Sequence, residues 1–92
     1  MAGPVFTKTA ISDGVVYDQP VRVRQIFIKT DGSGSPRVQL YDNTTATGTA
    51  ILDVQLGTDT TENINIPDNG LRVTNQLYAD LTNVTRITFF LS

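Results

Sequence analysis

Apolar and polar side chains alternate with a period of two through residues 38–56, and this alternation constrains the fold more than any other feature of the sequence. Val38 and Leu40 alternate with Gln39 and Tyr41 before a loop rich in Thr, Asn and Gly. After the loop, Leu52 and Val54 alternate with Asp53 and Gln55. A period of two places alternate side chains on opposite faces of a β-strand. The segment VQLYDNTTATGTAILDVQL therefore predicts a β-hairpin.

The same alternation recurs between turn signals along the rest of the chain. The longest strand candidate covers residues 21–30, where the apolar positions are odd up to Val23 and even from Ile26 onwards. A one-residue change of phase near Arg24-Gln25 is typical of a β-bulge. The alternative is a strand that is covered on both faces at this point, as in the centre of a sandwich. Proline followed by Asp-Asn-Gly makes residues 67–70 the strongest turn in the sequence. Further strands are expected near residues 15–17, 63–66, 71–73, 77–81 and 84–91.

This pattern predicts an all-β fold, an antiparallel β-sandwich or jelly-roll-like domain of about eight short strands with turns roughly every 8–12 residues. The 92 residues suffice for one domain. We expect residues 1–12, which include Pro4, to form an extended N-terminal arm, either as an edge strand or as an arm that reaches a neighbouring subunit, and residues 13–92 to form the sandwich. A partly ordered terminus is the alternative for the first segment.

The residue types needed for most active sites are missing from the sequence. It contains no His and no Cys, and its one Glu, Glu62, lies in a polar segment. Zinc and transition-metal sites depend on His or Cys, and acid–base catalysis favours His or paired carboxylates. Asp42 and Asp53 lie in opposite arms of the predicted hairpin, where they could face each other as a dyad, but we expect them to be solvated surface residues. We therefore expect no catalytic residue, no cofactor and no enzymatic activity.

A metal site is equally weakly supported. The eight Asp residues lie mostly beside Gly, Asn or Pro, where an Asp side chain caps a turn. A loop calcium site built from Asp31, Ser33 and Ser35 has no ligand spacing in its favour. We expect these residues to form turns and expect no metal.

Interaction surfaces are the more promising features. The net charge of −2 and the scattered cations argue against specific nucleic-acid binding. Several aromatic residues fall out of phase with the predicted core, and exposed apolar patches commonly mark protein contacts, although some of these residues could complete the core through bulges. Outward arginines on the long strand suit an interface. The candidate interface residues are Val5, Phe6, Tyr17, Arg22, Arg24, Phe27, Tyr41, Tyr78 and Phe90.

The hairpin segment and the later segment INIPDNGLRVTNQLYADLTNVTRITFFL resemble a recurring pattern in small structural proteins of tailed bacteriophages. In that pattern a strand ending in LYD leads to a Thr/Gly-rich loop and a second strand. A turn then precedes a Gly-hydrophobic-Arg-hydrophobic segment that ends in Leu-Tyr, here residues 70–78. The resemblance covers residues 21–91 and carries over no catalytic residue.

The resemblance implies a virion component, either a head decoration (cement) protein or a minor head or tail protein. The leading interpretation is a capsid decoration protein that stabilises the head by bridging capsid subunits. It implies the major capsid protein or other virion proteins as partners, a homo-oligomer such as a trimer, and location in the virion after synthesis in the host cytoplasm. No signal sequence or membrane-spanning segment is expected. The alternative is a carbohydrate-binding or receptor-binding β-sandwich module of a fibre, in which Tyr17, Tyr41 and Tyr78 would stack on sugar rings.

Overall fold

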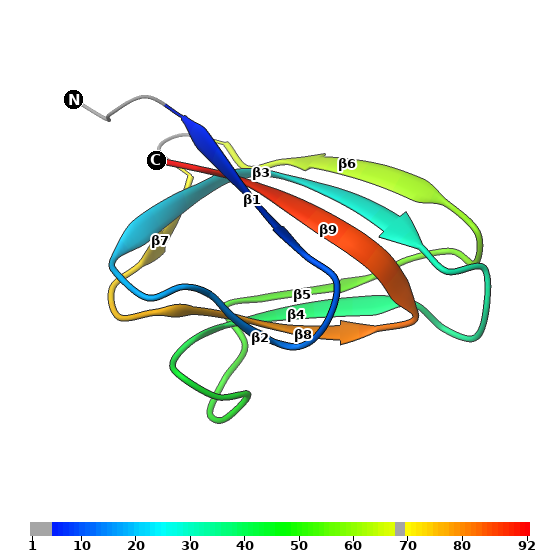
Figure 1. The fold of residues 1–92 in the computed structure, drawn as a ribbon, viewed down its shortest axis with the longest axis horizontal. Helices are drawn as coiled ribbons and strands as arrows, with labels where there is room; N and C mark the ends of the chain where they lie inside the picture. The colour runs from blue at the N-terminus through cyan, green and yellow to red at the C-terminus, as the bar shows by residue number, and fades with distance from the viewer. Residues whose placement is uncertain (1–4, 68–69) are drawn as a thin grey trace.

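The computed structural model describes residues 5–67 and 70–92, which fold into two antiparallel β-sheets packed face to face (Figure 1). Sheet A contains, in spatial order, β1 (Phe6–Ala10), β9 (Val84–Leu91), β3 (Val21–Thr30) and β6 (Thr61–Asn65), and β7 (Leu71–Val73) pairs with β3 beyond the end of β6. Sheet B contains β2 (Gly14–Tyr17), β8 (Leu77–Thr82), β4 (Arg37–Asp42) and β5 (Leu52–Gln55). The predicted all-β sandwich is confirmed.

The strand order is that of a jelly roll. Strand β1 pairs with β9, β2 with β8, β3 with β6 and β7, and β4 with β5, as in one long antiparallel hairpin rolled into two sheets. Strands β6 and β7 lie along successive parts of the same edge of β3. Counting them as one interrupted strand gives the eight strand positions of this architecture.

The predicted bulge in the long strand is confirmed. In the pairing of β3 with β9, Val23 lies opposite Leu91 and Gln25 lies opposite Phe90, so Arg24 is the extra residue. The bulge explains how β3 keeps its apolar side chains on one face although their positions in the sequence change from odd to even. The edge partner of β3 changes from β6 to β7 at the same place.

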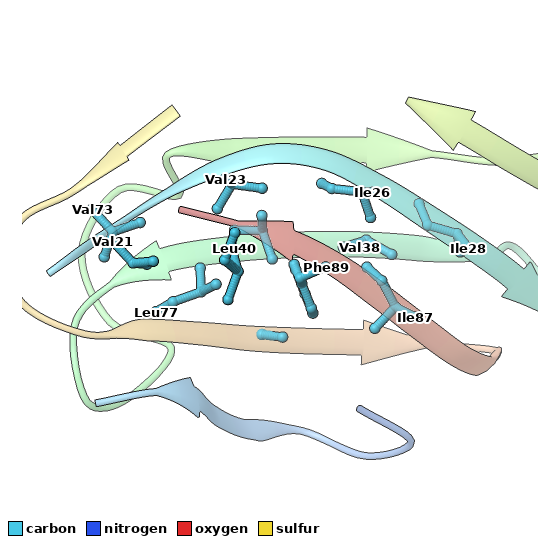
Figure 2. Close-up of a cluster of buried hydrophobic side chains, with 12 residues drawn as sticks. Val21, Val23, Ile26, Ile28, Val38, Leu40, Val73, Leu77, Ile87 and Phe89 are labelled. Carbon is cyan, nitrogen blue, oxygen red and sulfur yellow. The ribbon is translucent and has the colours of Figure 1, made fainter. Parts of the chain in front are cut away.

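The core lies between the two sheets and consists of the inward members of the alternating pattern (Figure 2). Strand β3 contributes Ile26 and Ile28, β4 contributes Val38 and Leu40, and β9 contributes Phe89, all fully buried. Because each strand supplies only every second residue, the other faces of both sheets remain available for polar groups or for partners.

The hairpin of residues 38–56 is present as β4 and β5. Val38 pairs with Val54 and Leu40 with Leu52, so the inward set of one arm meets the inward set of the other. The turn expected at residues 67–70 lies partly outside the described residues, but the Gly70 amide donates a hydrogen bond to the Pro67 carbonyl at 3.1 Å. This bond between the first and fourth residues is the usual one of a β-turn.

The N-terminal segment is extended, as expected, but it is not an arm separate from the sandwich. Residues Phe6–Ala10 form β1, whose five residues pair with Ile87–Leu91 of β9 at the edge of sheet A. The expected boundary between residues 12 and 13 therefore falls in the connection between two strands of the sandwich. Pro4 and the residues before it lie outside the described part of the chain.

Candidate interaction surfaces

Exposed apolar side chains are distributed along the N-terminal edge of the sandwich, which we define as Val5, Phe6, Ile11, Val15 and Tyr17. The first four of these are 55%, 37%, 74% and 43% exposed, and in the described residues the only other large hydrophobic side chain in this class is Phe27. The Phe6 and Tyr17 rings lie 5.4 Å apart, and the Lys8 amine lies 6.0 Å from the Tyr17 ring centre. Two predicted interface residues, Phe6 and Tyr17, are therefore in contact, and a third, Val5, directly precedes Phe6 in the chain.

Several features make this edge suitable for contact with another chain. Strand β1 is an edge strand, so its outer side has backbone groups that no other described strand pairs with. The Phe6–Tyr17 pair is tilted by 51°, a favourable arrangement for two rings. Sequence reasoning missed Ile11 and Val15. The exposure of Ile11 could have been predicted from its place in the sequence, because it directly precedes the turn-forming residues Ser12-Asp13-Gly14.

The outer face of sheet A forms a second surface, and its composition follows from the strand register. One row across the sheet contains Thr61, Lys29 and Arg86. The next row contains Asn63, Phe27, Thr88 and Thr9. The third row contains Asn65, Gln25, Phe90 and Thr7. The face is thus mainly uncharged and polar, with one well-exposed aromatic ring and two cations at one end.

A shallow hollow of about 340 Å³ lies at that end of the sheet A outer face, lined by Phe27, Lys29, Thr61, Arg86 and Thr88. Lys29 and Arg86 lie directly opposite each other on adjacent strands, and both are exposed. Phe27 is 42% exposed. The hollow therefore combines an apolar ring, two cations and two hydroxyl groups. Of its residues, only Phe27 was a predicted interface residue.

The other predicted residues on this side of the molecule have separate positions. Arg22 lies opposite Arg72 at the far end of β3, and Phe90 is half-buried in the third row. The bulge removes Arg24 from the alternation, and its Nε donates a hydrogen bond to Ser92 Oγ at 2.7 Å. Arg22 and Arg24 are therefore not equivalent outward arginines on this strand.

Charge is distributed unequally between the two sheets. Six of the seven Lys and Arg residues lie in strands of sheet A, and Arg37 lies in sheet B. In the described strands of sheet A the one carboxylate is Glu62, which the register places on the same side of the sheet as Ile28, away from the outer face. The register places four of the six cations, Arg22, Arg72, Lys29 and Arg86, on the outer side of sheet A, so this mainly uncharged face has a net positive charge although the whole chain has a charge of −2.

The outer face of sheet B holds the carboxylates Asp53 and Asp80 on either side of Gln39. Arg37 binds Asp53 with two hydrogen bonds, Nε to Oδ1 at 2.8 Å and Nη2 to Oδ2 at 2.5 Å. This hydrogen-bonded ion pair holds the pKa of the Asp53 carboxyl below its usual value. For Asp80, desolvation and then the nearby charge of Asp13 raise the pKa. These groups make sheet B the acidic side of the sandwich.

The expected exposure of Tyr41 is wrong. Tyr41 is only 9% exposed, and Tyr78, directly opposite it on β8, is half-buried. Tyr17 pairs in register with the core residue Leu77 and belongs to the N-terminal edge. The three tyrosines expected to bind sugar rings therefore do not share one exposed face.

The candidate dyad of Asp42 and Asp53 is also wrong. Asp53 is paired with Arg37, and it lies opposite Gln39 in the register. Asp42 accepts hydrogen bonds from the Thr74 amide at 2.9 Å, the Thr74 hydroxyl at 2.7 Å and the Asn75 amide at 2.7 Å. The carboxylate therefore fixes the turn between β7 and β8.

Asp31 shows how a carboxylate in a loop stabilises a turn by accepting hydrogen bonds. Asp31 Oδ1 accepts bonds from the Ser33 amide at 3.0 Å and the Ser33 hydroxyl at 2.8 Å, which is the turn interpretation made from the sequence. Within residues 5–67 and 70–92 no three His, Cys, Asp or Glu side chains gather into a possible metal site. The described residues also contain no helix long and apolar enough to cross a membrane.

Comparisons with protein-family models, curated proteins and solved structures give no match to this chain. The interpretation of its surfaces therefore depends on the geometry described above.

Proposed function

We propose that this protein is an adhesive structural component of a bacteriophage virion, in particular a decoration protein that bridges capsid subunits. The single observation that carries the proposal is the N-terminal edge, where four exposed apolar side chains lie beside an edge strand. Jelly rolls are recurrent in viral structural proteins, and the resemblance to phage structural proteins in residues 21–91 points the same way. The mechanism is addition of contact area across joints between subunits.

The energetics of the edge favour binding as an oligomer. Covering the four side chains from roughly half exposure would contribute about 4 kcal/mol at the usual value per buried aliphatic or aromatic side chain. Association costs at least about 4 kcal/mol in lost translational and rotational freedom. One edge therefore gives weak binding on its own, whereas several linked copies raise the effective concentration of each remaining edge. We therefore include a homo-oligomer, such as a trimer, in the proposal.

The experiment measures oligomeric state by light scattering and binding by co-sedimentation with capsids of the phage that encodes the chain. The double variant Ile11→Ser/Val15→Thr removes apolar surface from the edge, and the control Thr49→Ser/Gln55→Ser shortens two exposed side chains that lie outside the edge and outside the sheet A outer face. We expect an oligomer that sediments with capsids, loss of sedimentation in the edge variant and retention in the control. A strict monomer that stays in the supernatant, or equal binding by both variants, contradicts the proposal.

A further inference from the structure

The hollow on the sheet A outer face contains an arrangement that is unfavourable in the isolated protein. Lys29 and Arg86 occupy directly opposed positions on β3 and β9. Side chains at such positions have Cβ atoms about 5 Å apart, and like charges there are destabilising. In the described residues neither cation has a carboxylate within 4 Å, because the one ion pair at that distance joins Arg37 and Asp53. The hollow is thus complementary to an anion supplied from outside the chain.

From this arrangement we propose that the hollow binds carboxylate side chains of an acidic segment of a partner protein. Phe27 lies two residues before Lys29 on the same face of β3, so an apolar contact site lies about 7 Å from the cations. Thr61 and Thr88 provide hydroxyl groups at the border. An aromatic ring with adjacent Arg is the composition typical of a protein-binding centre.

Carboxylates of a protein fit this surface better than the phosphates of a nucleic acid. Beyond the hollow, the next two rows of the face hold Asn, Gln and Thr with the half-buried Phe90, and cations return only with Arg22 and Arg72 at the far end of β3. The face therefore lacks the continuous cationic path that a phosphate backbone requires. Phe27 is the one aromatic ring of the face in the exposed class, so successive bases would find no stacking platform.

Carboxylates border the same end of the face. Asp31 directly follows β3, and Asp59 lies against the same turn, with its Oδ1 3.7 Å from the Cβ position at Gly32. A long polyanion leaving the hollow in this direction would meet these like charges, whereas a short acidic segment would end before them. The border thus favours a compact anionic group.

The size of the site sets the expected strength. The hollow offers two cations and one ring, far less than the roughly 800 Å² per partner that a stable complex buries. We therefore expect weak, salt-sensitive binding of an isolated peptide, which becomes useful when the protein is held by another contact. This inference does not depend on the identity of the assembly, because it concerns a different face from the N-terminal edge.

The test is a nitrogen–proton NMR titration of the 10.0 kDa protein with a peptide that repeats Glu-Thr-Leu-Thr, which alternates acidic and apolar side chains on one side of an extended chain. A peptide with Gln in place of Glu is the matched ligand control. We expect the acidic peptide to shift the amides around Phe27, Lys29, Thr61, Arg86 and Thr88, and the Gln peptide to leave them unchanged.

Two charge-matched variants complete the design. Lys29→Gln/Arg86→Gln removes two cations from the hollow, and Lys8→Gln/Arg37→Gln removes two cations from other surfaces. We expect the first variant to weaken binding at least about tenfold and the second to bind as the unmodified protein does, a difference of about 1.4 kcal/mol. Equal weakening by both variants overturns the inference, as do shifts confined to other residues. Tighter binding of a thymidine oligonucleotide at the same amides would also overturn it and assign the face to nucleic acid.

Discussion

Reversing the charge of Lys29 should make the free protein more stable, because it converts the repulsive pair with Arg86 into an attractive one. At a head-group separation of about 6 Å in water, each unit-charge pair contributes about 0.7 kcal/mol. Lys29→Glu removes one such repulsion and adds an equal attraction, so the change in electrostatic energy is twice this value. Screening at physiological salt roughly halves the sum. Lys29→Glu should therefore raise the free energy of unfolding by about 0.7 kcal/mol.

A domain of this size gains about 4–8 °C in Tm for each kcal/mol, so the expected increase is roughly 3–6 °C. Lys29→Gln, which removes the repulsion without adding an attraction, should give about half of the effect. Urea denaturation followed by circular dichroism provides the free energies, and it needs no Trp, which the sequence lacks. In about 1 M salt, where the Debye length falls to about 3 Å, the gain should nearly disappear.

A double-mutant cycle with Arg86→Gln isolates the pair from all other effects of the substitution. The coupling predicts that Lys29→Glu stabilises the protein less when Arg86 has been neutralised. If Lys29→Glu lowers the free energy of unfolding, or if its effect is the same with and without Arg86, the two cations do not oppose each other and the argument from an unfavourable pair fails. Stabilisation together with loss of peptide binding would identify Lys29 as a residue kept for binding.

The remaining predictions concern the fold and its pH dependence. Gly70→Ala should lower the free energy of unfolding by about 2 kcal/mol or more, because φ is +80° and the new Cβ would lie 2.7 Å from the Val23 carbonyl oxygen. Gly48 has the same φ but open space around its Cβ position, so Gly48→Ala should lower the free energy of unfolding, measured by urea denaturation, by only about 1 kcal/mol. Burial raises the pKa of the Asp42 carboxyl, but hydrogen bonds, first those from Thr74, lower it by more, so the folded-state pKa lies below 3.8. The ionised carboxylate therefore stabilises the folded protein above pH 3.8, and this contribution is lost as the pH falls through the folded-state pKa. The stability advantage over Asp42→Asn should therefore shrink in acid, and an advantage independent of pH would contradict this. The pH dependence that Asp80 contributes has the opposite sign, because desolvation raises the pKa of its carboxyl above 3.8. The ionised carboxylate therefore destabilises the fold, so Asp80→Asn should be more stable than the unmodified protein near pH 7 and should lose that advantage below pH 3.8.

The sequence predicted the parts of the fold that depend on local patterns. Two-residue alternation identified the β4–β5 hairpin, and the change of phase near Arg24 identified the bulge, because both leave a trace in the order of apolar residues. The N-terminal segment was expected to be extended, with an edge strand as one of its possible forms, but the sequence did not identify β9 as its partner. That pairing joins residues about 80 positions apart in the chain, and no local pattern specifies it.

The candidate surfaces were predicted only in part for the same reason. Phe6 and Tyr17 were both predicted as interface residues, yet their contact depends on how β1 and β2 are placed by the turn at Ser12-Asp13-Gly14. Lys29 and Arg86 are separated by 57 positions, and only the register of β3 with β9 brings them together. Tyr41 shows the limit of alternation, because its position is on the outer face of sheet B and it is nevertheless buried.

Hydrogen–deuterium exchange of the β1 amides, measured on the free chain and on the chain bound to capsids, tests the central claim most directly. Amides on the open side of an edge strand exchange quickly when no partner covers them. If this molecule acts by adhesion through its N-terminal edge, exchange at Phe6–Ala10 slows on binding while exchange at the Arg37–Asp53 side of sheet B stays the same. Unchanged exchange throughout β1 on a saturated particle would contradict the account.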